Sequence, residues 1–71
     1  KLIVVGGKLS FRINSATPIS NVEVYSPEGL KVKELRLSDC SAFVSVAPGF
    51  YIVRITRGNG GAVVKKILVT E

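Results

Sequence analysis

The sequence of 71 residues contains no histidine, methionine or tryptophan, and it has a single cysteine. Without histidine the commonest general base is missing, and neither a Ser-His-Asp nor a Cys-His arrangement can form within the chain. The five acidic residues are scattered singly, so no carboxylate pair of the glycosidase kind is visible. One cysteine without histidine also excludes an ordinary zinc site. These absences predict a domain that is not an enzyme and that needs no cofactor or metal.

Long apolar runs and helical periodicity are also missing. No run approaches the roughly 20 apolar residues that a membrane-spanning helix needs. The composition, 46% hydrophobic and 21% charged, is that of a folded domain, and a chain of this length forms one small domain. Because the sequence begins at Lys1 rather than methionine, we interpret residues 1–71 as a single domain of a longer protein.

What the sequence does contain is a series of short alternating segments separated by turn signals. In the first segment Leu9, Phe11 and Ile13 share a face, and in the second Val22 and Val24 do so, after Pro18 interrupts the pattern. Six strands are expected, with residues 1–4 as a possible seventh: 8–14, 19–25, 30–37, 41–47, 50–56 and 62–69. The pattern predicts an all-β fold, a compact antiparallel β-sandwich or barrel.

Two of these segments carry further information. In 30–37, Leu30 and Leu35 have opposite parity, which a β-bulge near Lys33–Glu34 would repair; alternatively the strand begins only at Glu34. Segment 50–56 is apolar on both faces until Arg54, which predicts a central strand.

The net charge of +5 suits nucleic acid, an anionic glycolipid or an acidic protein surface, or serves only solubility. Nucleic acid is the least expected of these partners, because the aromatic residues do not form a stacking platform. Phe11 is in phase with the core, and Phe50 and Tyr51 adjoin on a strand that looks buried. Cys40 has no partner for an internal disulfide. We expect it to be a small, partly buried residue in a polar turn, with pairing between chains as the minority alternative.

Lys65 and Lys66 stand side by side within the last strand. Successive strand residues point to opposite faces, so one lysine belongs to the inward-facing row unless a bulge frees it. Its stem could run along the apolar surface to water, the pair could protect an edge strand from aggregation, or a partner could read it. Edge protection is favoured on physical grounds alone, and partner recognition also requires an accessible edge.

Three motifs follow one another in a fixed order. The first is a strand ending in VEVY with a glycine four residues after the tyrosine, the second is VAPGFYIVR, and the third is VVKKILV close to the last residue. The positions that carry them are Val22, Val24, Tyr25, Gly29, Val46, Pro48, Gly49, Tyr51, Val53, Arg54, Lys65, Lys66, Ile67, Leu68 and Val69. This set, over essentially the whole chain, resembles the C-terminal sorting domain of type IX secretion cargo in Bacteroidetes-type bacteria. Ser26-Pro27 and Cys40 depart from the pattern without removing a motif residue.

The resemblance implies a compact Ig-like β-sandwich of about seven strands that is not catalytic and acts as a secretion signal. Its parent protein would pass through the periplasm, and type IX translocon components would direct it to the cell surface or outer membrane, or release it as a secreted protein. A sortase-like cysteine protease and anionic lipopolysaccharide are further implied partners of many members.

On the basis of this resemblance, we predict that the translocon recognises the terminal strand through Lys65, Lys66, Ile67, Leu68 and Val69. The remaining motif positions are expected to be structural: Tyr25, Gly29, Pro48, Gly49, Tyr51 and Arg54. The same edge strand could also pair two copies into a homodimer. The alternative is a generic Ig-like or fibronectin-like accessory or adhesion module, which explains the fold equally well.

Overall fold

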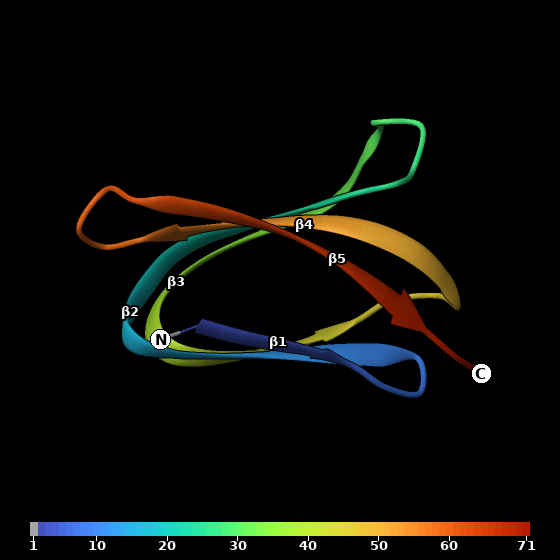
Figure 1. Ribbon diagram of the computed structural model, residues 1–71, viewed down its shortest axis with the longest axis horizontal. Coiled ribbons are helices and arrows are strands. Elements are labelled where there is room, and N and C mark those ends of the chain that lie inside the picture. The colour runs from blue at the N-terminus through green and yellow to red at the C-terminus, as the bar shows by residue number, and fades with distance from the viewer. Residues whose placement is uncertain (1) are drawn as a thin grey trace.

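The computed structural model describes residues 2–71, which form five strands and no helix (Figure 1). In chain order the strands are β1 (Leu2–Gly6), β2 (Ser10–Tyr25), β3 (Lys31–Ser45), β4 (Gly49–Arg57) and β5 (Ala62–Val69). They pair antiparallel in the order β1-β2-β4-β5, and β3 also pairs with β2. Within residues 2–71 no helix exists that could cross a membrane. The predicted all-β, antiparallel class is confirmed.

Strand β2 organises the sheet because its two halves have different neighbours. Residues 10–14 lie between β1 and the second half of β3, whereas residues 19–25 lie between the first half of β3 and β4. Register shifts between the two halves bend the strand. The sheet therefore curls over itself, with β1 and the start of β2 on one side and β4 and β5 on the other (Figure 1).

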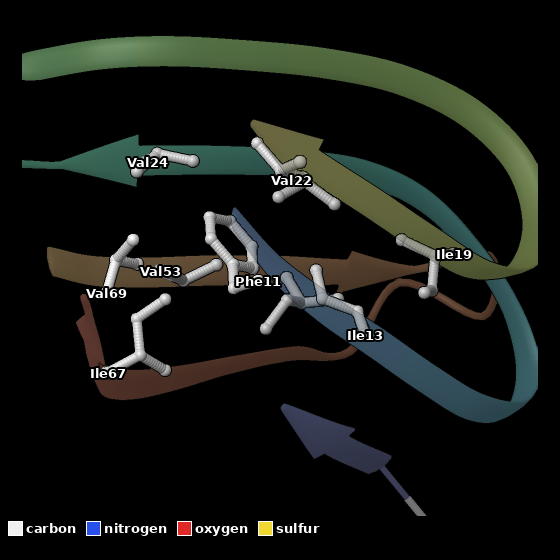
Figure 2. Packing of buried hydrophobic residues seen from close by; sticks show 10 residues of the cluster. Phe11, Ile13, Ile19, Val22, Val24, Val53, Ile67 and Val69 are labelled. Carbon is white, nitrogen blue, oxygen red and sulfur yellow. The ribbon is translucent and has the colours of Figure 1, made fainter. Parts of the chain in front are cut away.

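The core fills the space inside this curl. Side chains from three strands approach one another there: Phe11 and Ile13 of β2, Val53 of β4, and Ile67 and Val69 of β5 (Figure 2). The complete set of buried apolar side chains is Phe11, Ile13, Ile19, Val22, Val24, Val44, Val53, Ile55, Ile67 and Val69. Their removal from water is the main term that favours the folded state, and the two predicted inward rows of residues 8–14 and 19–25 supply four of them. Leu9, expected in the first row, is instead 54% exposed, because it precedes β2 in a left-handed conformation with φ 54°.

The expected number of strands, about seven, is not confirmed, since the structure has five. The sequence predicted breaks at Pro18 and at residues 38–41, but both segments are bends inside the continuous strands β2 and β3. Pro18 is tolerated because it lies between Asn14 and Ile19, where β2 has no registered partner in β3 and a missing N–H costs no ladder hydrogen bond. A turn residue therefore marks a bend here and does not end the strand.

Strand β3 contains the predicted bulge, close to its expected place. Val24 is paired with Lys33 and Tyr25 with Lys31, which leaves Val32 as the extra residue. Leu30 before this bulge is exposed, whereas Leu35 beyond it packs against the core. The phase slip in the sequence thus has the physical cause that was expected.

Two further expectations about single residues were wrong. Cys40 is exposed and belongs to β3, because it lies at the bend where the pairing jumps from Ser41 to Asp39. Strand β4 is central, between β2 and β5, as predicted, but Phe50 on it is 65% exposed. It sits near the start of β4, on the face that points away from the core.

Candidate interaction surface on the terminal strand

The last strand, β5, lies at an edge of the sheet, as both interpretations of its lysine pair required. It pairs with β4 in an unbroken register from Gly49↔Val69 to Thr56↔Ala62. Its other side meets the chain only near the end, where Leu9 N donates to Thr70 O at 2.7 Å and Thr70 N to Gly7 O at 3.0 Å. Across residues 62–67, no further strand of the described part of the chain pairs with it.

The hydrogen bonds at both ends of β5 show which backbone groups are open. Arg57 N donates to Gly61 O at 2.7 Å, so Gly61 faces β4, whereas the bonds of Thr70 face the other way. Backbone groups of successive residues in an antiparallel strand point to alternate sides. The N–H and C=O groups of Val64 and Lys66 therefore face outward, along the edge. This row of donors and acceptors is available to an added strand.

The two lysines occupy opposite faces and both are exposed. Lys66 is paired with Ile52 on the outer face, and Lys65 is paired with the buried Val53 in the inward row. No register shift interrupts β5, so Lys65 is not freed by a bulge. Its side chain reaches water from the inward row, as a long basic stem can. Both cationic groups are thus accessible beside the open edge.

The five terminal motif residues divide into two structural sets. Ile67 and Val69 belong to the core (Figure 2). They are 7% and 1% exposed, while Leu68 is 50% exposed. The terminal motif therefore anchors β5 with alternate residues and displays the others.

The displayed residues join a larger surface that we name the β4–β5 outer face. It consists of Phe50, Ile52, Arg54, Val64, Lys66 and Leu68, which the register places in three cross-strand pairs. Phe50 stands opposite Leu68, and Val64 is 59% exposed. A hollow of about 270 Å³ is lined by Pro27, Phe50, Tyr51, Ile52 and Lys66. The surface combines apolar area with two cations, and composition alone did not reveal that Phe50 belongs to it.

Beside this face, an ionic network is centred on Glu23. Its carboxylate accepts a hydrogen bond from Tyr25 Oη at 3.1 Å and lies 3.2 Å from Lys31 Nζ and 3.8 Å from Arg54 Nη1. The motif residues Tyr25 and Arg54 thus meet at one carboxylate. Sequence reasoning missed Glu23, because only the register between β2 and β4 brings it next to Arg54.

A second carboxylate extends the network across β3. Glu34 accepts hydrogen bonds from Lys31 Nζ at 2.9 Å and from Asn21 Nδ2 at 3.2 Å. The hydrogen bond from Lys31, and then that from Asn21, holds the pKa of Glu34 below its ordinary value. The same contact with Glu34, and then that with Glu23, raises the pKa of Lys31. Both groups are therefore charged around neutral pH.

The other motif residues shape turns. Tyr51 Oη donates to Ala47 O at 2.7 Å, and its ring packs against the core. Gly49, which follows the exposed Pro48, has φ 147°, and Gly29 has φ 90°. Both values lie in a region that residues with a Cβ rarely adopt. The structural role of Pro48, Gly49, Gly29 and Tyr51 stays a prediction.

Within residues 2–71, no three side chains that commonly ligate metals come together. No family model matches the chain, and no curated protein is significantly similar to it. The candidate site therefore rests on its geometry: an open strand edge, two exposed lysines and a partly apolar outer face.

Proposed function

We propose that this chain is a non-catalytic secretion signal domain that directs its parent protein through the type IX outer-membrane translocon to the cell surface. The observation that carries the proposal is the position of the Lys-Lys motif. Lys65 and Lys66 lie on an edge strand with both side chains exposed and with open backbone groups between Ala62 and Ile67. A signal that another protein reads requires such access.

Recognition is proposed to occur by strand addition. An extended segment of a translocon component pairs with the outward backbone groups of Val64 and Lys66, because main-chain hydrogen bonds supply affinity in this mode. Acidic side chains on that segment meet Lys65 and Lys66 and speed association. Apolar side chains contact Leu68 and Phe50, which are 50% and 65% exposed.

The finer fold assignment is part of the same proposal. We infer an Ig-like β-sandwich in which the bent strands β2 and β3 each take the place of two shorter strands, which brings five strands close to the expected seven. The hydrogen bond from Tyr51 Oη to the Ala47 carbonyl supports this inference, because a tyrosine that bonds back to nearby backbone is a feature of Ig-like domains.

The pathway and its partners follow from this role. The parent protein passes through the periplasm, and the translocon component then takes it to the surface. There a sortase-like cysteine protease removes the domain and joins the parent to anionic lipopolysaccharide, or the domain is retained.

The test is a fusion of residues 1–71 to a periplasmic reporter in a type IX-competent host. We expect the reporter at the cell surface, and we expect Lys65→Glu with Lys66→Glu to reduce surface reporter by about tenfold, because reversed charge opposes an acidic partner. Lys8→Glu with Lys33→Glu is the matched control, since it changes two other exposed lysines by the same charge. The control should export normally.

A reporter that stays in the periplasm would contradict the proposal and favour a generic Ig-like accessory or adhesion module. The Tyr51–Ala47 hydrogen bond is expected of such a module too, so the fusion is the measurement that separates them. Normal export of the double glutamate variant would leave the lysines as protectors of the edge. Mass spectrometry of the exported product would show whether the domain remains attached.

A further inference from the structure

The longest open edge in the described part of the chain belongs to β3, not to the terminal strand. β3 extends over 15 residues, Lys31–Ser45, and pairs on one side only, with β2. By comparison β5 has 8 residues and β1 has 5. An uncovered edge of this length is a template for another strand unless its side chains prevent pairing.

The hydrogen-bond pattern shows which groups of β3 are open. The bond from Arg57 N to Gly61 O fixes β4 so that Arg54 directs its backbone groups toward β2. Glu23 therefore faces β4, and its neighbours in β2 face β3. The bond from Ser26 N to Leu30 O, at 2.8 Å, agrees with this alternation.

It follows that Glu34, which is paired with Glu23, points its backbone groups away from β2. Arg36 is paired with Asn21 and does the same, because it lies two residues further along β3. The open backbone groups thus belong to two residues of opposite charge on either side of Leu35.

The charges along this edge are complementary to themselves. If a second copy of β3 is laid antiparallel with Leu35 opposite Leu35, each Glu34 stands opposite an Arg36. In the same register Lys33 stands opposite the uncharged Leu37, so no two like charges face each other. A register centred on Lys33, Glu34 or Arg36 would instead place that charge against its own copy, which is unfavourable in a cross-strand pair.

We propose that two copies of this chain associate through antiparallel pairing of their β3 edges, centred on Leu35. The backbone groups of Glu34 and Arg36 supply the new ladder, and their side chains form two symmetric ion pairs. The curled sheets of the two copies join into one continuous sheet across the two-fold axis. This pairing leaves β5 free and does not depend on a role in secretion.

The other two open edges are poorer partners for a second copy. β5 has only basic charge, Lys65 and Lys66, and its end is closed by the bonds between Thr70 and residues 7–9. β1 contains no charged residue in its range, LIVVG, to select a register. A homodimer through the terminal strand, which the sequence suggested, is therefore less favourable than one through β3.

Two single substitutions and their mixture test the proposal. Arg36→Glu places two acids opposite each other in the pair, and Glu34→Arg places two arginines there. Each variant alone should dimerise at least about tenfold more weakly than the unmodified chain. An equimolar mixture restores Glu opposite Arg in both pairs and should form heterodimers about as well as the unmodified chain. Sedimentation across a concentration series measures association, and circular dichroism checks that each variant is folded.

Lys33→Glu is the matched control for Arg36→Glu, because it makes the same charge change on the same strand but stands opposite the uncharged Leu37. It should dimerise about as well as the unmodified chain. The register is tested by Leu35→Cys in a Cys40→Ser background, which should form an intermolecular disulfide readily, since opposed residues at a two-fold axis are close enough to bridge. Leu37→Cys in that background, also half-buried against the core, should not cross-link.

Dimerisation of the unmodified chain, with loss in both single variants and recovery in the mixture, supports the proposal. Failure of the unmodified chain to dimerise at about 1 mM overturns it, because a dissociation constant above that value is too weak to matter for most complexes. So does a mixture that fails to associate, or cross-linking through residue 37 as efficient as through residue 35. Reporter export is unaffected by any of these outcomes under the proposed function, so the two proposals fail separately.

Discussion

The two edge strands β3 and β5 solve the same physical problem in different ways. Both expose backbone groups along one side, and an open edge invites unwanted pairing. β5 carries charge of one sign at Lys65 and Lys66, so copies of it repel one another and an acidic partner is favoured. β3 carries charges of both signs around Leu35. Its opposite charges are therefore matched when a second copy of β3 pairs antiparallel with it, centred on Leu35.

β5 and the first half of β3 differ in how firmly they are tied to the core, although Val44 in the second half of β3 is 1% exposed. β5 contributes Ile67 and Val69, which are 7% and 1% exposed, whereas Leu35 and Leu37 of β3 are only partly buried. β5 is therefore anchored in the core at Ile67 and Val69, and Leu68 between them is displayed on its outer face. β3 near residue 35 is held mainly by its ladder with β2 and by the network around Glu23 and Glu34.

The largest expected effect is a loss of stability when a core residue of β5 is truncated, and it should exceed the loss at a part-buried residue of β3. Ile67→Ala should lower the free energy of unfolding by about 2–5 kcal/mol, since it leaves a cavity in the core. Leu35→Ala should cost about 1–2 kcal/mol, because less apolar area is lost at a part-buried site. Leu68→Ala, at an exposed site, should change stability by no more than about 0.5 kcal/mol. Urea denaturation of the three variants measures the order, and equal losses at Ile67 and Leu35 would show that the strands are tied equally.

A smaller effect is expected when the hydrogen bonds between Thr70 and residues 7–9, which close the end of β5, are disrupted. A Cβ added at Gly6 would overlap the carbonyl oxygen of Leu68, a backbone atom that cannot move aside cheaply. Gly6→Ala should therefore cost about 1–3 kcal/mol, as overpacking does, and open the end of β5. Gly7→Ala is the control, since its Cβ would lie 3.7 Å from the nearest atom, Ser10 O. Hydrogen exchange at Thr70 N–H should accelerate in the first variant only.

The smallest expected effect is the pH dependence of stability at Glu34. Protonation of Glu34 removes a negative charge from β3, which leaves that strand more basic and in this respect more like β5. Lys31 and Asn21 hold the pKa of Glu34 below its ordinary value of 4.5. A depressed folded-state pKa means that the stabilisation by this carboxylate is present above pH 4.5 and is lost as pH falls through the lowered value. Glu34→Gln should therefore be slightly less stable than the unmodified chain at pH 6, and the difference should shrink as pH falls below 4.5 through the lowered pKa. A difference that does not shrink as pH falls would assign the effect to packing.

Much of the fold could be predicted from local patterns. Most of the alternating rows of residues 8–14 and 19–25, the central position of β4 and the bulge in β3 follow from parity and composition, because a half-buried strand imprints a period of two on its sequence. Leu9 and Ile19 are the exceptions, since Leu9 is exposed and Ile19 is buried out of phase. The exposure of Phe50 and of Cys40 could not be predicted in this way. Phe50 lies on the outward face near the start of its strand and Cys40 lies at a bend, and neither circumstance is visible in a single segment.

The candidate site was predictable in part for the same reason. Adjacency alone required Lys65 and Lys66 to point to opposite faces. Which face of β5 is buried could not be predicted, so it was not known that Ile67 would be buried and Leu68 exposed. The carboxylate that joins Tyr25 and Arg54 belongs to Glu23, between two buried valines. Only the register between β2 and β4 identifies it.

By itself, then, the sequence determined the all-β class, the inward rows and the divergence of the lysine pair, because these depend on the two-residue period of a strand. Tertiary structure alone decided that Pro18 marks a bend, that β3 and β5 are open edges as β1 is, and that the charges of β3 and β5 face water beside unpaired backbone groups. Those properties depend on which strands become neighbours, and hydrogen-bonded neighbours are chosen by contacts between residues far apart in the chain.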